Sequence, residues 1–163
     1  MVQRIYRIPR VTKPGVPLSA YEDTHAFKLY ILDTGLLGAL SGLDVRTLLE
    51  GNRVFEEFKG VLGEQYVLRQ LVSEHSIKPF YWSAERADAE VDFLFQSGSH
   101  VVPLEVKAAA NLKAKSLRRY SEKYSPPVAL RTSLSDYRKD SGLINVPLYA
   151  LICIPEIIAT NYG

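Results

Sequence analysis

The sequence predicts an α/β fold in which a mixed β-sheet carries helices on both faces. Three observations support this class: a long helical pattern over about 54–72, a strand–turn–strand pattern over 90–107, and a second helical pattern over about 112–124 that stops at Pro126-Pro127. The expected core order is helix, three strands, helix, strand. With 163 residues, 47% of them hydrophobic, the chain is long enough for one domain with a substantial core.

The elements are expected in a definite order along the chain. Residues 1–24 are predicted to be an irregular arm because Pro9, Pro14, Gly15 and Pro17 interrupt any regular pattern, and residues 25–163 are predicted to form the domain. The domain is expected to contain a strand at 28–32, a small helix through Leu40, the long helix, strands at 79–82, 90–96 and 100–107, the second helix, strands at about 128–132 and 147–153, and a short helix after Pro155.

The strands at 90–96 and 100–107 form the most informative pair. Gly98-Ser99 has the composition of a two-residue hairpin turn, which would place Asp92 opposite Glu105 and Glu90 opposite Lys107. A slip by one residue would disrupt both faces of the hairpin, so the register is well determined. One face would carry Asp92, Glu105 and Lys107, and the other would carry Val91, Phe93, Phe95, Val102, Leu104 and Val106.

The Asp…Glu-x-Lys arrangement is the layout of a divalent-metal site for cutting phosphodiester bonds. Side chains directly opposed across a hairpin have Cβ atoms roughly 5 Å apart, so Asp92 and Glu105 can share one cation. Without a cation or Lys107 between them, the two like charges destabilise the pair. The simpler alternative is a structural cross-strand ion pair between Glu90 and Lys107.

Glu64 is an exception within the long helix. Its neighbours at helical spacing are apolar or glycine, so its carboxylate points toward the core, where it is costly unless it is paired or bound to metal. The alternative is a glutamate at the edge of the helix whose carboxylate reaches water.

Composition limits the remaining function classes. The single cysteine, Cys153, fits a reducing cytoplasmic setting, and the longest apolar stretch, Leu148 to Ile154, is far too short to span a membrane. A net charge of +2 does not by itself indicate nucleic acid. Lys113, Lys115, Arg118 and Arg119 make the second helix basic, which is typical of a solvated face, although a helix directly after the metal motif could also contact phosphates.

These residues carry a resemblance to the PD-(D/E)XK nuclease superfamily, whose members have a restriction-endonuclease-like fold. More specifically, the chain resembles an uncharacterised domain family found C-terminal to the ATPase module of many bacterial and archaeal AAA+-type ATPases. Val91 stands where the superfamily motif has proline. The resemblance covers roughly residues 26–154 and rests on Phe27 to Leu36, Gly63-Glu64, Phe80-Tyr81-Trp82, Glu90-Val91-Asp92-Phe93 and Glu105-Val106-Lys107.

The resemblance implies a metal-dependent nuclease that acts on nucleic acid, with DNA more expected than RNA. Asp92, Glu105 and the backbone carbonyl of Val106 would hold Mg²⁺ or Mn²⁺, Glu64 would contribute through water or a second metal, and Lys107 would act on water and phosphate. The family context also implies an upstream ATPase and winged-helix region. The chain has no G-x-x-x-x-G-K-[ST] motif, so ATP is expected only in that module. A binding module without turnover, an assembly domain of the ATPase and a homo-oligomer remain alternatives.

Overall fold

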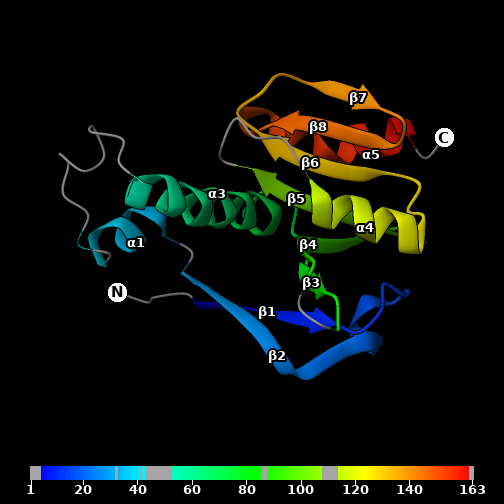
Figure 1. The fold of residues 1–163 in the computed structure, drawn as a ribbon, viewed down its shortest axis with the longest axis horizontal. Helices are drawn as coiled ribbons and strands as arrows, with labels where there is room; N and C mark the ends of the chain where they lie inside the picture. Colours follow the sequence, from blue (N-terminus) through cyan, green and yellow to red (C-terminus); the bar gives the residue numbers. More distant parts are fainter. Residues whose placement is uncertain are drawn as a thin grey trace.

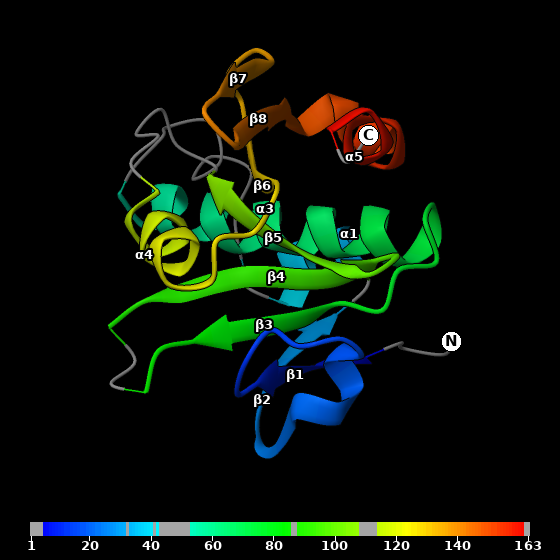
Figure 2. The same ribbon diagram turned by 90° about the vertical axis from the view of Figure 1, so that its right-hand side faces the viewer.

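A computed structural model describes residues 5–31, 33–40, 42, 53–85, 88–107 and 114–161. Its centre is an eight-stranded mixed sheet with strand order β2-β1-β3-β4-β5-β6-β8-β7 (Figure 1). Helices cover both faces of this sheet, as Figure 2 shows from the side. The α/β class is confirmed. Within the described ranges, no helix is both long and apolar enough to cross a membrane.

The predicted core order is confirmed, because α3, three strands, α4 and β6 follow one another along the chain. The helical segments are η1 (Leu18–Tyr21), α1 (Thr34–Leu40), α3 (Arg53–Ser73), α4 (Lys115–Tyr124), η2 (Leu148–Cys153) and α5 (Ile154–Asn161), where η marks a 3-10 helix. The strands are β1 (Ile5–Val11), β2 (Glu22–Ile31), β3 (Phe80–Ser83), β4 (Glu90–Ser97), β5 (His100–Lys107), β6 (Ala129–Ser133), β7 (Arg138–Asp140) and β8 (Leu143–Pro147).

The N-terminal region forms regular structure, so the prediction of an irregular arm over 1–24 is wrong for the described residues. β1 pairs with β2 as an antiparallel hairpin and with β3 in parallel, through Arg10 and Val11. The β1 strand tolerates Pro9 because this residue lies where the β1–β2 register shifts, a position that needs no regular ladder hydrogen bond. Pro14 and Pro17 lie in the connection between the two strands.

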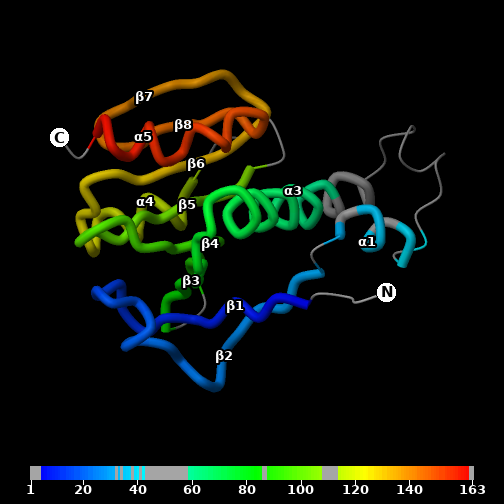
Figure 3. The backbone as a smooth tube through the Cα atoms, turned by 180° about the vertical axis from the view of Figure 1, so that it is seen from behind, coloured from blue at the N-terminus to red at the C-terminus, as the bar shows by residue number. Residues whose placement is uncertain are grey.

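The C-terminal apolar run is helical, so the prediction of a strand over 147–153 is also wrong. On the side of β6 away from β5, the pairing strand is β8, which ends at Pro147, and residues 148–161 continue as η2 and α5. An apolar run without alternation does not distinguish a strand from a buried helix. Figure 3 shows α5 running beside β8.

The sheet separates two hydrophobic cores. The α3-side core contains Ile8, Tyr30, Val67, Leu68, Leu71, Tyr81, Phe93, Phe95, Val102, Leu104, Val106, Val128, Leu130, Ile144, Val146, Leu151, Ile154 and Ile158. The α4-side core contains Val11, Leu18, Phe80, Trp82, Ala89, Val91, Leu94, Leu117, Tyr120 and Ala129. A buried side chain on a strand therefore belongs to the α3-side or the α4-side core according to the face of the sheet on which it lies.

The β4–β5 hairpin has the predicted register from Phe93↔Leu104 to Ser97↔His100. Gly98 has φ +58°, a conformation that glycine adopts readily. The predicted face is wrong for Val91, which packs in the α4-side core. The register between β3 and β4 shifts between Trp82↔Val91 and Phe80↔Leu94, so β4 contains one extra residue there and the alternation of its side chains is broken.

Candidate functional site

Three carboxylates surround the ammonium group of Lys28, which sequence reasoning did not identify. The Nζ atom lies 2.5 Å from Glu90 Oε1, 3.9 Å from Glu64 Oε2 and 3.9 Å from Asp92 Oδ1. It also lies 5.2 Å from the centroid of the Tyr81 ring. Strand β2, helix α3 and strand β4 therefore meet at this lysine. The available signal was the alternation of Lys28 and Tyr30, which places both on one face of a strand.

Asp92 lies where the β4–β5 hairpin opens. Its Oδ2 accepts a hydrogen bond from the N–H of Val106 over 2.8 Å, which holds the carboxylate beside the Glu105–Val106 peptide. Burial of the carboxyl, followed by the negative charge of Glu64, raises the pKa of Asp92 to about 7. The Val106 N–H and Lys28 oppose this rise. Burial is therefore the main reason why the pKa of Asp92 is raised, and the charge of Glu64 adds to it.

Glu105 is buried on the other side of β5. Leu104 and Val106 pack in the α3-side core, so Glu105 between them points toward α4. Its Oε1 lies 2.6 Å from Lys107 Nζ, and its Oε2 accepts the N–H of Leu117 over 3.2 Å. That N–H is in the first turn of α4, where backbone donors lack helical partners, so Glu105 satisfies the start of this helix.

Glu64 is paired, as its core-facing position requires. The hydroxyl of Tyr30 donates to Glu64 Oε2 over 2.8 Å, and the same oxygen faces Lys28. Burial, together with the nearby Glu64 charge, raises the pKa of Tyr30, so the hydroxyl stays protonated and acts as a donor. Burial alone would lower the pKa of Lys28, but the surrounding carboxylates outweigh it and the pKa is raised.

The structure separates the partners of Asp92 and Glu105, which corrects the prediction that both act from one face. Asp92 shares Lys28 with Glu64, whereas Glu105 contacts Lys107 and α4. The charge of Glu105 still makes a smaller upward contribution to the pKa of Asp92. Among the described residues, no three His, Cys, Asp or Glu side chains form a ready-made metal site.

Two further predictions concerned the Glu90–Lys107 ion pair and the basic residues of the second helix. The alternative ion pair of Glu90 with Lys107 is replaced by the contact of Glu90 with Lys28. On α4, Arg119 pairs with Asp88 at 2.6 Å and Arg118 with Glu122 at 3.3 Å, which favours a solvated face. Lys115 is exposed, and Lys113 lies outside the described residues.

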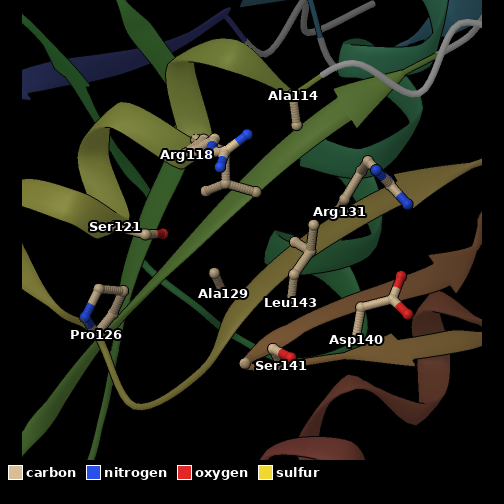
Figure 4. A pocket seen from close by; sticks show the side chains of 11 residues that line it. Ala114, Arg118, Ser121, Pro126, Ala129, Arg131, Asp140, Ser141 and Leu143 are labelled. Atoms are coloured by element: carbon tan, nitrogen blue, oxygen red, sulfur yellow. The ribbon is translucent and has the colours of Figure 1, made fainter.

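A cavity of about 620 Å³ lies between α4, β6 and the β7–β8 turn (Figure 4). Arg131 lines it and is buried, with its Nε donating to Asn145 Oδ1 over 2.9 Å. The register aligns Glu105, Arg131 and Asn145 across three strands. A charged residue inside the buried strand at 129–133 was the signal that could have identified this polar row.

Comparison with known proteins adds a family but no activity. Two relatives, an uncharacterised protein of Mycobacterium bovis and one of Mycobacterium tuberculosis, are each 36% identical over 80 residues. The match covers 49% of this chain and 17% of each relative, so the chain corresponds to a small part of them. A family profile described as a domain of unknown function matches residues 59–151, which include Glu64, Asp92, Glu105 and Lys107. Since this match covers more than half of the chain, the chain belongs to the DUF4143 family.

Proposed function

We propose that this domain is a metal-dependent phosphodiester hydrolase that acts on nucleic acid, with DNA more expected than RNA, as part of an AAA+-type ATPase. The observation that carries the proposal is that Asp92 accepts a hydrogen bond from the N–H of Val106, the residue between the paired Glu105 and Lys107 on β5. Glu64 lies on the α3 side of the same group through Lys28. The group combines acids for a cation with an ammonium for a phosphate.

The residues fit a hard divalent cation in their chemistry. Mg²⁺ and Mn²⁺ prefer carboxylate and carbonyl oxygens, and a nearby cation would offset the cost of ionising Asp92, whose pKa is raised mainly by burial and then by the charge of Glu64. Asp92 and Glu105 would hold the ion, with the Val106 carbonyl and Glu64 as further ligands. When bound, a divalent ion polarises a phosphoryl oxygen and lowers the pKa of bound water.

The side chains of the site have separate tasks in this proposal. The Val106 N–H orients Asp92, and the Leu117 N–H orients Glu105. The ammonium of Lys107, held by Glu105 and 30% exposed, is accessible to substrate and stabilises negative charge that develops on the phosphate. Lys115 on α4 is exposed and supplies positive charge for the nucleic-acid backbone, while Arg118 and Arg119 would exchange their partners Glu122 and Asp88 for phosphates.

A second candidate function is a binding or assembly module of the ATPase without turnover. Its supporting observation is that the carboxylates already have partners: Lys28 contacts three of them and Lys107 contacts the fourth. The absence of a three-ligand group among the described residues agrees with this alternative. An assembly role would also suit a homo-oligomer.

The test combines metal binding with cleavage. Calorimetry with Mn²⁺ should show binding by the wild type that Asp92→Asn or Glu105→Gln abolishes, because each change removes a charged ligand. Glu122→Gln, which alters an exposed carboxylate on α4, is the matched control and should bind normally. Equal titrations for all four proteins would assign the two acids a structural role.

Cleavage is measured in the full-length ATPase with ATP, Mn²⁺ and a panel of single-stranded, duplex and branched DNA and RNA. Lys107→Ala should keep metal binding and lose cleavage, because its ammonium acts on water and phosphate rather than on the ion. If the wild type cuts no substrate while Lys107→Ala and Asp92→Ala still bind nucleic acid, the binding or assembly function is correct.

A further inference from the structure

We propose that the cavity between α4, β6 and the β7–β8 turn binds one nucleotide of a nucleic-acid strand, with its phosphate at Arg131 and its base against the apolar wall (Figure 4). The inference rests on the proposed function and deepens it, because it assigns a place to one nucleotide beside the Glu105–Lys107 pair. The volume of about 620 Å³ lies within the range of about 300–1,000 Å³ that is usual for small-molecule sites.

Arg131 is a preorganised anion-binding group in the wall of this cavity. It is 7% exposed, and a guanidinium does not lose its charge in proteins. Its Nε donates to Asn145 Oδ1 over 2.9 Å, which fixes the plane of the guanidinium. Asn145 is itself held, because its Nδ2 donates to the backbone oxygens of Ser135 and Asp136 over 3.1 and 2.9 Å. A guanidinium whose plane is fixed in this way loses little entropy when it binds the oxygens of a phosphate.

The charges that line the cavity favour an anion. Arg118 comes from α4 and Arg131 from β6, on facing sides of the cavity in Figure 4. The ion pair of Arg118 with Glu122 joins two exposed side chains, so a phosphate can replace Glu122 at little cost. Asp140 also lines the cavity, but it pairs with Arg138 at 2.7 Å, which compensates its charge. The lining is therefore better suited to a phosphate than to a neutral ligand.

The remaining wall suits the flat apolar face of a nucleobase. Four apolar residues line this part of the cavity: Leu117, Pro126, Ala129 and Leu143. Leu117 and Ala129 belong to the α4-side core, so the surface that they provide is anchored. Ser141 in the β7–β8 turn offers a hydroxyl to the polar edge of the base. One phosphate and one base therefore account for both kinds of lining.

The cavity adjoins the Glu105–Lys107 pair through two of its lining residues. Arg131 is the register partner of Glu105 on the neighbouring strand, and the N–H of Leu117 donates to Glu105 Oε2 over 3.2 Å. Both of these neighbours of Glu105 line the cavity. A nucleotide bound there lies next to the place where the proposed function puts the phosphodiester bond.

The experiment measures the binding of deoxyadenosine monophosphate to the 163-residue chain by calorimetry in EDTA, so that no metal ion takes part. Deoxyadenosine and inorganic phosphate should each bind about tenfold more weakly or less, because each makes only one half of the contacts. Arg131→Gln removes the buried charge and should weaken nucleotide binding about 10- to 100-fold.

A second variant tests the cavity without changing Arg131. Ser121 lines the cavity from α4, so Ser121→Trp should fill it and abolish nucleotide binding. Ser121→Ala keeps the cavity open, and Lys123→Gln alters a lysine of the same helix that lies over the Tyr124 ring. Both control variants should bind the nucleotide as the wild type does. Thermal melts show which variants are folded, and Ser121→Trp decides alone if Arg131→Gln is unfolded.

The outcomes separate this inference from the proposed function. Equal affinities for the nucleotide and for inorganic phosphate would indicate a simple anion site, and equal nucleotide affinities of the wild type, Arg131→Gln and Ser121→Trp would place the nucleotide elsewhere. Either result overturns the inference, as does an absence of binding by the wild type. Cleavage of nucleic acid without nucleotide binding overturns only this inference, whereas nucleotide binding without cleavage keeps the site and refutes the hydrolase.

Discussion

Replacement of Asp92 by asparagine should stabilise the metal-free protein at pH 8. The pKa of Asp92 rises from 3.8 to about 7 in the folded protein, mainly through burial and through the charge of Glu64. At about 1.4 kcal/mol per unit of pKa, ionised Asp92 costs the folded state on the order of 4 kcal/mol. Asparagine keeps an oxygen for the Val106 N–H but loses the attraction to Lys28, so a net gain of about 1–3 kcal/mol is expected.

The sign of the pH dependence follows from proton binding. Because the folded pKa of Asp92 lies above the unfolded value, the folded state binds its proton more tightly. The resulting stability is fully present below about pH 4 and is lost as the pH rises toward 7. The advantage of Asp92→Asn should therefore be small at pH 4 and reach its full size by pH 8.

Urea unfolding in EDTA, followed by the fluorescence of the only tryptophan, Trp82, measures this difference. Trp82 is buried in the α4-side core, so its emission reports loss of the sheet. Asp88→Asn is the matched control: Arg119 holds the pKa of Asp88 below its usual range, so this change should not stabilise the protein at pH 8. An equal gain for Asp92→Asn at both pH values, or a loss at pH 8, would refute the electrostatic reasoning.

Two further variants test the supports of the site. Tyr30→Phe removes the hydroxyl that donates to Glu64 and should lower the free energy of unfolding by about 1–3 kcal/mol, because the carboxylate loses a hydrogen bond. Tyr6→Phe, measured in the same urea titration, is the control. Equal losses of stability in the two variants would contradict the reasoning. Asn145→Ala removes the amide that joins Arg131, Ser133 and the 135–136 backbone. It should cost about 2–4 kcal/mol in thermal unfolding, and a cost below 1 kcal/mol would show that this network contributes little.

Local sequence signals predicted the parts of the fold that local geometry determines. The turn at Gly98-Ser99 and the alternation around it correctly gave the register from Phe93↔Leu104 onward. The break beyond Phe93 was not predictable from the hairpin alone, because it depends on how β4 pairs with β3 at Trp82. The alternation of Lys28 and Tyr30 predicts only that they share a strand face, because the partners of Lys28 depend on the packing of β2, α3 and β4 together.

The shift in register explains how the folded protein tolerates two carboxylates at this place. In a regular hairpin Asp92 and Glu105 would stand directly opposite each other, and like charges in that position are destabilising. The extra residue of β4 leaves the two acids near different ammonium groups: Asp92 shares Lys28 with Glu64 and Glu90, and Glu105 contacts Lys107. Separate lysines compensate the two negative charges in the metal-free fold. Under the proposed function, metal binding should raise the stability of the wild type more than that of Asp92→Asn, by an amount that grows with Mn²⁺ concentration.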